Sequence, residues 1–324
     1  MLVSVIIPVF NAEPYIERCI QVLSSQTYRD FESIFVVDGK CTDNTLQILQ
    51  NITDTPFSIK IVKQHDDKKA GGARNIGVNN ATGDYLWFMD VDDCPCNTFM
   101  EEMVKTITET DDDVAICNFC YSRTTDKYTI PEKNYKNKKY TGLEAITALN
   151  NGKLSANIWD KLYKTSFIKD NNISFIAGCS EDYAFVLNSF LSTDKIVYYN
   201  KPLYVYYLHD DSTSKGQGDE IAKRDIEIFI EFATKMKESD SPYYEEYCST
   251  TLRHILHSLT NVSKSAFKRL SKAEIINESL KYKQKGFSME VFIFKISKRM
   301  FYFIGRNARR LKYSQDRLFF DNDF

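Results

Sequence analysis

The chain has 324 residues, of which 43% are hydrophobic and 14% aromatic, and its formal net charge is −2. This composition can build a full core, which excludes a disordered protein, and the length fits one large domain with an appendage or two domains. Residues 285–313 hold eight Lys or Arg against the single acid Glu290, so the rest of the chain is acidic and we expect it to bind no nucleic acid.

The first 120 residues alternate short apolar runs with amphipathic stretches. Strands are predicted over 3–9, 34–37, 59–62, 85–89 and 113–119. Helices are predicted between them, and the first carries the stripe Ile16, Cys19, Ile20 and Leu23. Strands and helices alternating at this interval predict an α/β fold with a mostly parallel, doubly wound sheet.

The rest of the chain is predicted to complete this domain and to add a second region. Residues 142–150 and 180–191 are predicted helices, and from 216 onward the composition is polar and helical. We predict a domain over 1–215 and a helical region over 216–324. With no basic leader and no run of 18 apolar residues, we expect a cytoplasmic protein without a membrane span.

Three carboxylates follow the predicted strand 85–89, at Asp90, Asp92 and Asp93. The carboxyl ends of parallel strands are where ligands bind in open α/β sheets. Carboxylates this close repel one another unless a cation lies among them, and oxygen ligands suit Mg²⁺ or Mn²⁺. The run therefore predicts a cation that holds a diphosphate. The alternative is an acidic loop that caps the next helix.

Further segments fall in a recognisable order around this acidic run. They are Val3–Asn11, Ser25–Tyr28, Val36–Asp38, Ala73–Asn75, Asp90–Asp93, Glu181–Asp182 and His209–Ser212. Together they resemble the family 2 inverting glycosyltransferases, which have a GT-A-type nucleotide-sugar-binding fold. The resemblance covers about residues 1–215. It implies a nucleotide-sugar half at about 1–120 and an acceptor half at about 121–215.

The resemblance implies roles for particular residues. The donor site would comprise Pro8, Val9, Phe10, Asn11, Asp38, Arg74, Asp90 and Asp92. The metal ligands would be Asp92, Asp90 and His209, with Asp93 as either a further ligand or a helix cap. The catalytic base would be Asp182, in the first turn of a helix capped by Ser180, and the acceptor side would include Trp159, Lys161 and Glu181.

Each of these roles has a structural alternative that the residues leave open. Glu181 and Asp182 would also suit a helix N-terminus, Trp159 would suit a core, and His209 would suit a structural position after an aromatic strand. One departure from the family pattern is Gly39, where many relatives carry a second carboxylate.

The implied activity is metal-dependent transfer of a sugar, with inversion, from a nucleoside-diphosphate sugar to a hydroxyl. The expected donor is a UDP-sugar, and the expected acceptor is a glycan or a lipid-linked molecule in cell-surface polysaccharide synthesis. The Q-x-x-R-W signature of processive synthases is absent, so transfer of one or a few sugars is expected. The alternatives are a sugar-1-phosphate nucleotidyltransferase, which needs a glycine-rich loop that residues 10–14 lack, and a non-catalytic scaffold of the same fold.

Residues 287–311 mix aromatic and aliphatic residues with Lys and Arg. A basic amphipathic helix of this type can lie on an anionic membrane, which would make the protein peripheral on the inner face of the cell membrane. The alternatives are a helix that packs on the catalytic domain and a homodimer interface.

Overall fold

The computed structural model of the protein describes residues 1–65, 69–122, 137–176, 180–207, 218–241, 243–282 and 289–305. The chain divides into two compact units. Unit 1 comprises Met1–Ala145 and Ala156–Ser212, and unit 2 comprises Ile146–Ser155 and Thr213–Phe324. The candidate site belongs to unit 1.

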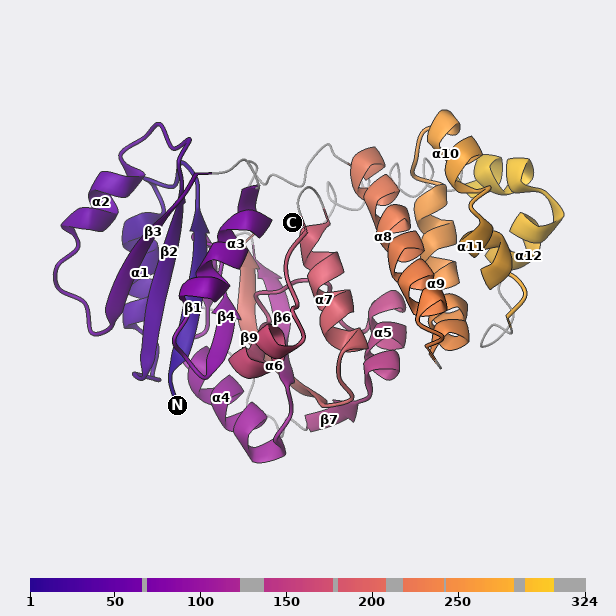
Figure 1. Ribbon diagram of the computed structural model, residues 1–324. Helices are drawn as coiled ribbons and strands as arrows, with labels where there is room; N and C mark the ends of the chain where they lie inside the picture. The colour runs from indigo at the N-terminus through magenta and orange to yellow at the C-terminus, as the bar shows by residue number, and fades with distance from the viewer. Residues whose placement is uncertain are drawn as a thin grey trace, which may run out of the picture. The chain divides into compact units, whose positions relative to one another are not determined.

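Unit 1 contains a mixed, mostly parallel sheet, which has nine strands among the described residues (Figure 1). The strands are β1 Val3–Val9, β2 Phe31–Asp38, β3 Ser58–Gln64, β4 Tyr85–Phe88, β5 Cys94–Pro95, β6 Val114–Ser122, β7 Asn137–Tyr140, β8 Lys161–Lys164 and β9 Ile196–Tyr207. Their order in the sheet is β3-β2-β1-β4-β8-β6-β9-β5, with β7 paired to β9.

The N-terminal half of the sheet is parallel. Strand β1 pairs in parallel with β2 and β4, and β2 pairs in parallel with β3. Val9 lies opposite Val37, and Ile6 lies opposite Phe88, so the carboxyl ends of β1, β2 and β4 lie along one edge. The strands predicted in this half of the chain are confirmed, as is the α/β fold.

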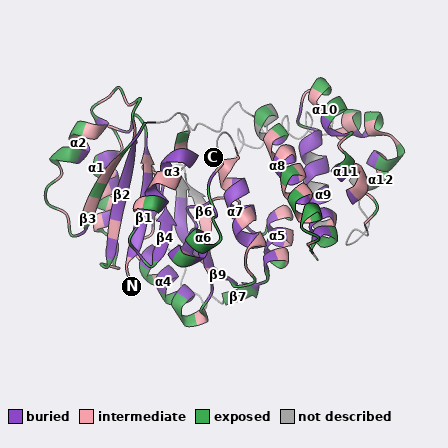
Figure 2. Ribbon diagram, in the orientation of Figure 1, coloured by how far each residue is buried: buried purple, intermediate pink, exposed green. Residues whose placement is uncertain are grey.

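Both faces of this sheet are covered, as its near-continuous apolar strands require. On one face Val5 and Ile7 share a core with Cys19 and Met103, which belong to α1 (Ile16–Ser24) and α4 (Phe99–Thr110). On the other face lies α3 (Lys69–Asn80), where a Cβ on Gly77 would lie 2.3 Å from Cγ2 of Ile6. A residue without a side chain therefore lets α3 lie close to β1. Figure 2 shows the resulting burial of the strands.

Strand β8 interrupts the parallel order. It pairs antiparallel with both β4 and β6, whereas β6 and β9 are parallel to each other. The sequence patterns predicted no strand at 161–164. The remaining helices of unit 1 are α2 Thr45–Asn51, α6 Thr165–Asp170 and α7 Glu181–Leu191, and α5 Gly142–Asn150 contains the boundary between the units.

Unit 2 is helical in its described residues. Its helices are α8 Gly218–Glu238, α9 Tyr244–Leu259, α10 Lys264–Leu270, α11 Glu274–Ser279 and α12 Met289–Ile296, and residues 298–305 are also helical. The rings of Phe229 and Tyr247 stack between α8 and α9 at 5.7 Å. Ser263 begins α10 by accepting a hydrogen bond from the amide of Ala266. None of the helices in the described ranges is long and apolar enough to cross a membrane.

Candidate functional site

The edge at the carboxyl ends of β1 and β2 presents an exposed aromatic ring. Phe10, directly after β1, is 59% exposed, whereas Val9 before it is 2% exposed. Asn11 follows with a φ of 46°, and its side-chain carbonyl accepts a hydrogen bond from the amide of Thr42 at 2.8 Å. The loop after β1 is therefore tied to the loop after β2, and Phe10 is left open to a planar ligand.

Asp38 ends β2 at the same edge. Its Oδ1 accepts a hydrogen bond from the amide of Lys40 at 2.8 Å, which forms a tight turn. Gly39 within this turn donates its amide to the carbonyl oxygen of Gln64 at 2.8 Å, and a Cβ there would lie 2.7 Å from that oxygen. The close approach of β3 therefore leaves no room for a side chain at position 39 in this structure.

Arg74 of α3 forms ion pairs with three carboxylates, one in the loop after β4 and two in the first turn of α7. They are Asp90 at 3.0 Å, Asp182 at 3.1 Å and Glu181 at 3.3 Å. We call these four residues the Arg74 cluster. Burial alone would lower the pKa of Arg74, whose side chain is 5% exposed, but the three carboxylates together raise it. The guanidinium is therefore a fixed positive charge that links the end of β4 to the start of α7.

Asp182 lies in the first turn of α7, as the sequence predicted. The predicted cap is wrong, because Ser180 adopts a φ of 58° and its side chain makes no capping hydrogen bond. The Asp182 side chain remains 34% exposed. Burial by the surrounding protein raises its pKa to about 7, which Arg74 opposes and Glu181 reinforces. A carboxyl that ionises near neutral pH can take up a proton from a bound hydroxyl.

Asp93 holds the loop of residues 90–93, which we call the acidic loop, against the rest of unit 1. It is 4% exposed, and the hydroxyl of Tyr204 on β9 donates a hydrogen bond to its carboxylate at 2.6 Å. Burial, with Asp90 and Asp92 nearby, raises its pKa well above the usual value. Of the two roles considered for Asp93, the helix cap is excluded, because α4 begins only at Phe99.

Two residues that the sequence patterns did not mark also hold this loop. Tyr204 anchors Asp93, and the guanidinium of Arg18 on α1 donates to the backbone carbonyl of Asp92. Neither has a local sequence signal, because each reaches the loop from an element distant in the chain.

Asp90 and Asp92 fit a divalent cation by their chemistry. Both are carboxylates on one short loop, and Asp90 keeps 35% of its side chain exposed beside Arg74. Among the residues that the structure describes, no three His, Cys, Asp or Glu side chains gather into a metal site. Mg²⁺ commonly takes only one or two protein carboxylates, together with waters and substrate phosphates. The predicted ligand His209 lies outside the described residues.

Trp159 and Lys161, which were predicted to contact the acceptor, lie in the interior of unit 1. Trp159 is 3% exposed and stacks on Tyr204 with ring centroids 4.3 Å apart. The Lys161 side chain is fully buried, and its ammonium contacts the carboxylate of Asp160 at 2.7 Å. A packed core explains both positions, so neither side chain is open to an acceptor.

The chain is similar to many glycosyltransferases, and three of them are GlyA, YibD and TarS. Glycosyltransferase GlyA of Streptococcus pneumoniae is 28% identical over 231 residues, which are 66% of this chain and 31% of GlyA. The uncharacterized glycosyltransferase YibD of Escherichia coli is 32% identical over 218 residues, 65% of this chain and 63% of YibD. The chain thus matches less than two thirds of either relative.

The third is Staphylococcus aureus TarS, a poly(ribitol-phosphate) β-N-acetylglucosaminyltransferase, which is 25% identical over 90% of this chain and 46% of TarS. The crystal structure of TarS residues 1–349 with UDP-GlcNAc superposes with a TM-score of 0.67 at 18% identity, covering 96% of this chain and 92% of that one. This likeness establishes a GT-A-type fold.

The model of the family named Glycosyl transferase family 2 matches residues 4–173. That range is just over half of the chain, and it contains Phe10, Asp38, Arg74, Asp90 and Asp92. The chain therefore belongs to glycosyltransferase family 2.

Proposed function

We propose that unit 1 binds a nucleoside-diphosphate sugar at the edge formed by Phe10, Asn11 and Asp38. The exposed ring of Phe10 offers a face for a nucleobase, and Asp38 offers an acceptor for base or ribose hydrogen bonds. Pro8 and Val9, which end β1, would complete this donor site through their backbone. The first donor to test is a UDP-sugar, because TarS was crystallised with UDP-GlcNAc.

Asp90 and Asp92 would hold Mn²⁺ or Mg²⁺ together with the donor diphosphate. Once bound, such an ion neutralises the charge that develops on the leaving nucleoside diphosphate. The chain's own contribution is to keep the loop in place, through Tyr204 on Asp93 and Arg18 on the carbonyl of Asp92.

Asp182 would act as the base that deprotonates the acceptor hydroxyl. The observation that carries this proposal is the Arg74 cluster, in which a single guanidinium contacts Asp90 on the donor side and Asp182 at the start of α7. A base this close to the acidic loop suits direct displacement of the nucleoside diphosphate by the acceptor hydroxyl, and direct displacement inverts the anomeric centre of the sugar. Glu181 contacts the same guanidinium and stays our candidate for the acceptor side.

The acceptor would be a glycan or a lipid-linked molecule in cell-surface polysaccharide synthesis. Support comes from the similarity to TarS, a poly(ribitol-phosphate) β-N-acetylglucosaminyltransferase. The proposal includes transfer of one or a few sugars rather than processive synthesis.

The donor site can be tested by thermal melting with UDP-GlcNAc, UDP-glucose and GDP-mannose, each with Mn²⁺. A donor at about 100 times its Kd stabilises the native state by about 2.7 kcal/mol, which corresponds to a rise of roughly 5–10 °C. Asp92→Ala should abolish the rise, whereas Asp54→Ala, which removes an exposed carboxylate outside the site, should retain it. If no nucleotide sugar shifts the melting temperature, the proposed donor site is wrong.

A further inference from the structure

Large apolar side chains are exposed together near the end of the described chain. Across the described residues, eight large hydrophobic side chains are exposed, and five of them fall in a stretch of thirteen residues. These five are Phe292, Ile296, Met300, Phe303 and Ile304, with exposures from 42% for Met300 to 68% for Phe303. Isolated exposed hydrophobic residues are common on protein surfaces, but a contiguous group marks an interaction site.

This group lies on two successive helical segments, α12 and residues 298–305. The exposed positions fall at i, i+4, i+8, i+11 and i+12, and two further exposed positions between them are Lys295 and Arg299. Ser297 separates α12 from the helical residues 298–305, and its hydroxyl accepts a hydrogen bond from the amide of Met300 at 3.2 Å. We call these seven side chains the exposed stripe.

The opposite face of the same segment is fixed within unit 2. Phe294 and Phe301 are buried and make an edge-to-face contact at 5.2 Å. The ammonium of Lys298 donates to the carbonyl of Ser271 and the side chain of Asn277. The exposed stripe is therefore presented by a segment that is already docked, rather than by an unpaired helix.

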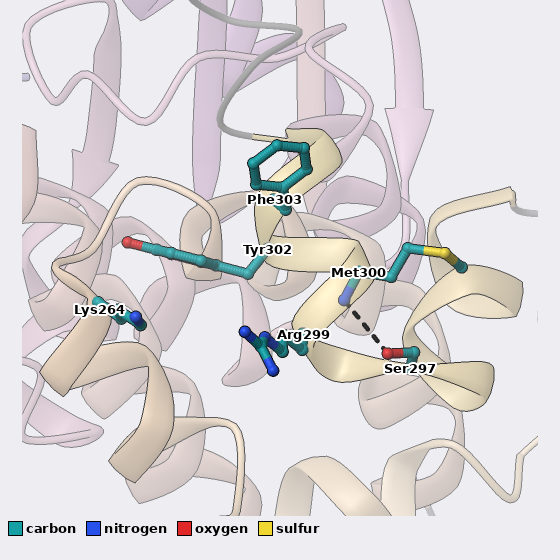
Figure 3. A pocket seen from close by; sticks show the side chains of 6 residues that line it. All are labelled: Lys264, Ser297, Arg299, Met300, Tyr302 and Phe303. Carbon is teal, nitrogen blue, oxygen red and sulfur yellow. Dashed lines mark hydrogen bonds between the residues drawn. The ribbon is translucent and has the colours of Figure 1, made fainter.

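Next to the exposed stripe lies a hollow of about 590 Å³ that combines cations with apolar walls. Figure 3 shows Lys264 of α10 and Arg299 around it, with Met300, Tyr302 and Phe303. Both cations are exposed. Two cations beside apolar side chains can contact a phosphate whose attached chains are hydrocarbon.

We propose that the exposed stripe docks the protein on a membrane surface of anionic phospholipid, with Lys295, Arg299 and Lys264 facing the headgroup phosphates. Charge complementarity selects this occupant. No acid occurs between 291 and 305, so a second copy of the same face would oppose cations to cations. A lipid surface supplies both the negative charge and the apolar layer, which is the setting of interfacial amphipathic helices. This inference concerns unit 2 alone and does not depend on the proposed function.

The test is co-sedimentation of the full chain with phosphatidylcholine vesicles, with and without phosphatidylglycerol. We expect binding that requires phosphatidylglycerol and weakens as salt is added. Each basic residue near an anionic surface contributes about 1 kcal/mol, so Lys295→Gln with Arg299→Gln should weaken binding about 30-fold. The matched control is Lys223→Gln with Lys235→Gln, which removes two exposed cations of α8 and should leave binding within about twofold.

Phe303→Ser tests the apolar part and should also weaken binding. The substituted side chains are exposed, so melting temperatures should be nearly unchanged and folding is not in question. The proposal is overturned if the wild-type chain stays in the supernatant with both vesicles, or if the α8 control loses binding as strongly as the stripe variant. It is also overturned if sedimentation velocity shows a dimer that Phe303→Ser converts to a monomer, because the face is then a self-association surface.

Discussion

Replacing Arg74 with methionine tests whether the Arg74 cluster links the acidic loop at Asp90 electrostatically to Asp182, the proposed base. Methionine keeps an unbranched apolar stem near the ring of Phe175, which lies 5.5 Å from the guanidinium carbon. The charge is lost, and three carboxylates are left close together without it. We therefore expect effects on both stability and the ionisation of Asp182.

The size of the stability effect follows from the burial of the cluster. Removing one partner of a buried ion pair typically costs about 3–5 kcal/mol. Here the carboxylates keep between 21% and 35% of their side chains exposed, so solvent screens part of the repulsion. We expect Arg74→Met to lose about 2 kcal/mol, or roughly 4–8 °C in melting temperature.

The effect on ionisation has a direction that can be measured separately. Arg74 is the strongest influence that holds the pKa of Asp182 down against burial, so the pKa should rise above about 7 in the variant. The acidic limb of the transfer rate should move to higher pH, and Arg74→Lys should restore part of the shift. Arg29→Met, which removes an exposed arginine bonded to the carbonyl of Ser24, is the control and should change neither quantity. An Arg74→Met protein with the wild-type pH profile would refute the reasoning.

Three further outcomes follow from the same geometry. For the wild-type chain, the rate of sugar transfer at saturating acceptor should fall about tenfold from about pH 8 to about pH 6. The reason is that Asp182 must be ionised to act as a base and its pKa is about 7. A transfer rate that does not change with pH would exclude Asp182 as the base. Because the pKa of Asp182 is raised from 3.8 to about 7, protonated Asp182 stabilises the folded protein at low pH, and this stabilisation is lost as the pH rises through about 7. The asparagine variant cannot ionise, so the melting temperature of Asp182→Asn relative to wild type should rise between about pH 5 and about pH 8. Phe10→Ala should weaken donor binding about tenfold in calorimetric titration through loss of a stacking ring, and Tyr243→Ala, an exposed aromatic of unit 2, should not.

The parallel half of the fold could be predicted because it follows from local patterns, whereas Arg74, Glu181 and Asp182 were singled out by the resemblance to family 2 glycosyltransferases. Apolar runs bounded by turns located β1 to β4, and parallel strands bring their carboxyl ends to one edge. Asp38 and Asp90 therefore share that edge. Arg74, which the resemblance assigned to the donor site, contacts Asp90 at 3.0 Å.

The rest depends on pairing between distant segments. Strand β8 is a four-residue strand whose antiparallel place between β4 and β6 has no signal in its own residues. Trp159, which stacks on Tyr204, and Lys161 within β8 are both buried, although the resemblance placed them beside the acceptor. Tyr204 reaches Asp93 across 111 positions, a separation that no local periodicity encodes.

The most direct test of the central claim is to measure donor affinity and sugar transfer on the same two variants. Asp182→Asn should bind the nucleotide sugar with Mn²⁺ within about twofold of wild type and lose transfer by about a thousandfold, because only the proton acceptor is removed. Asp92→Ala should lose Mn²⁺-dependent donor binding itself. If Asp182→Asn transfers sugar at the wild-type rate, or if both variants lose donor affinity equally, the division between donor loop and base is wrong.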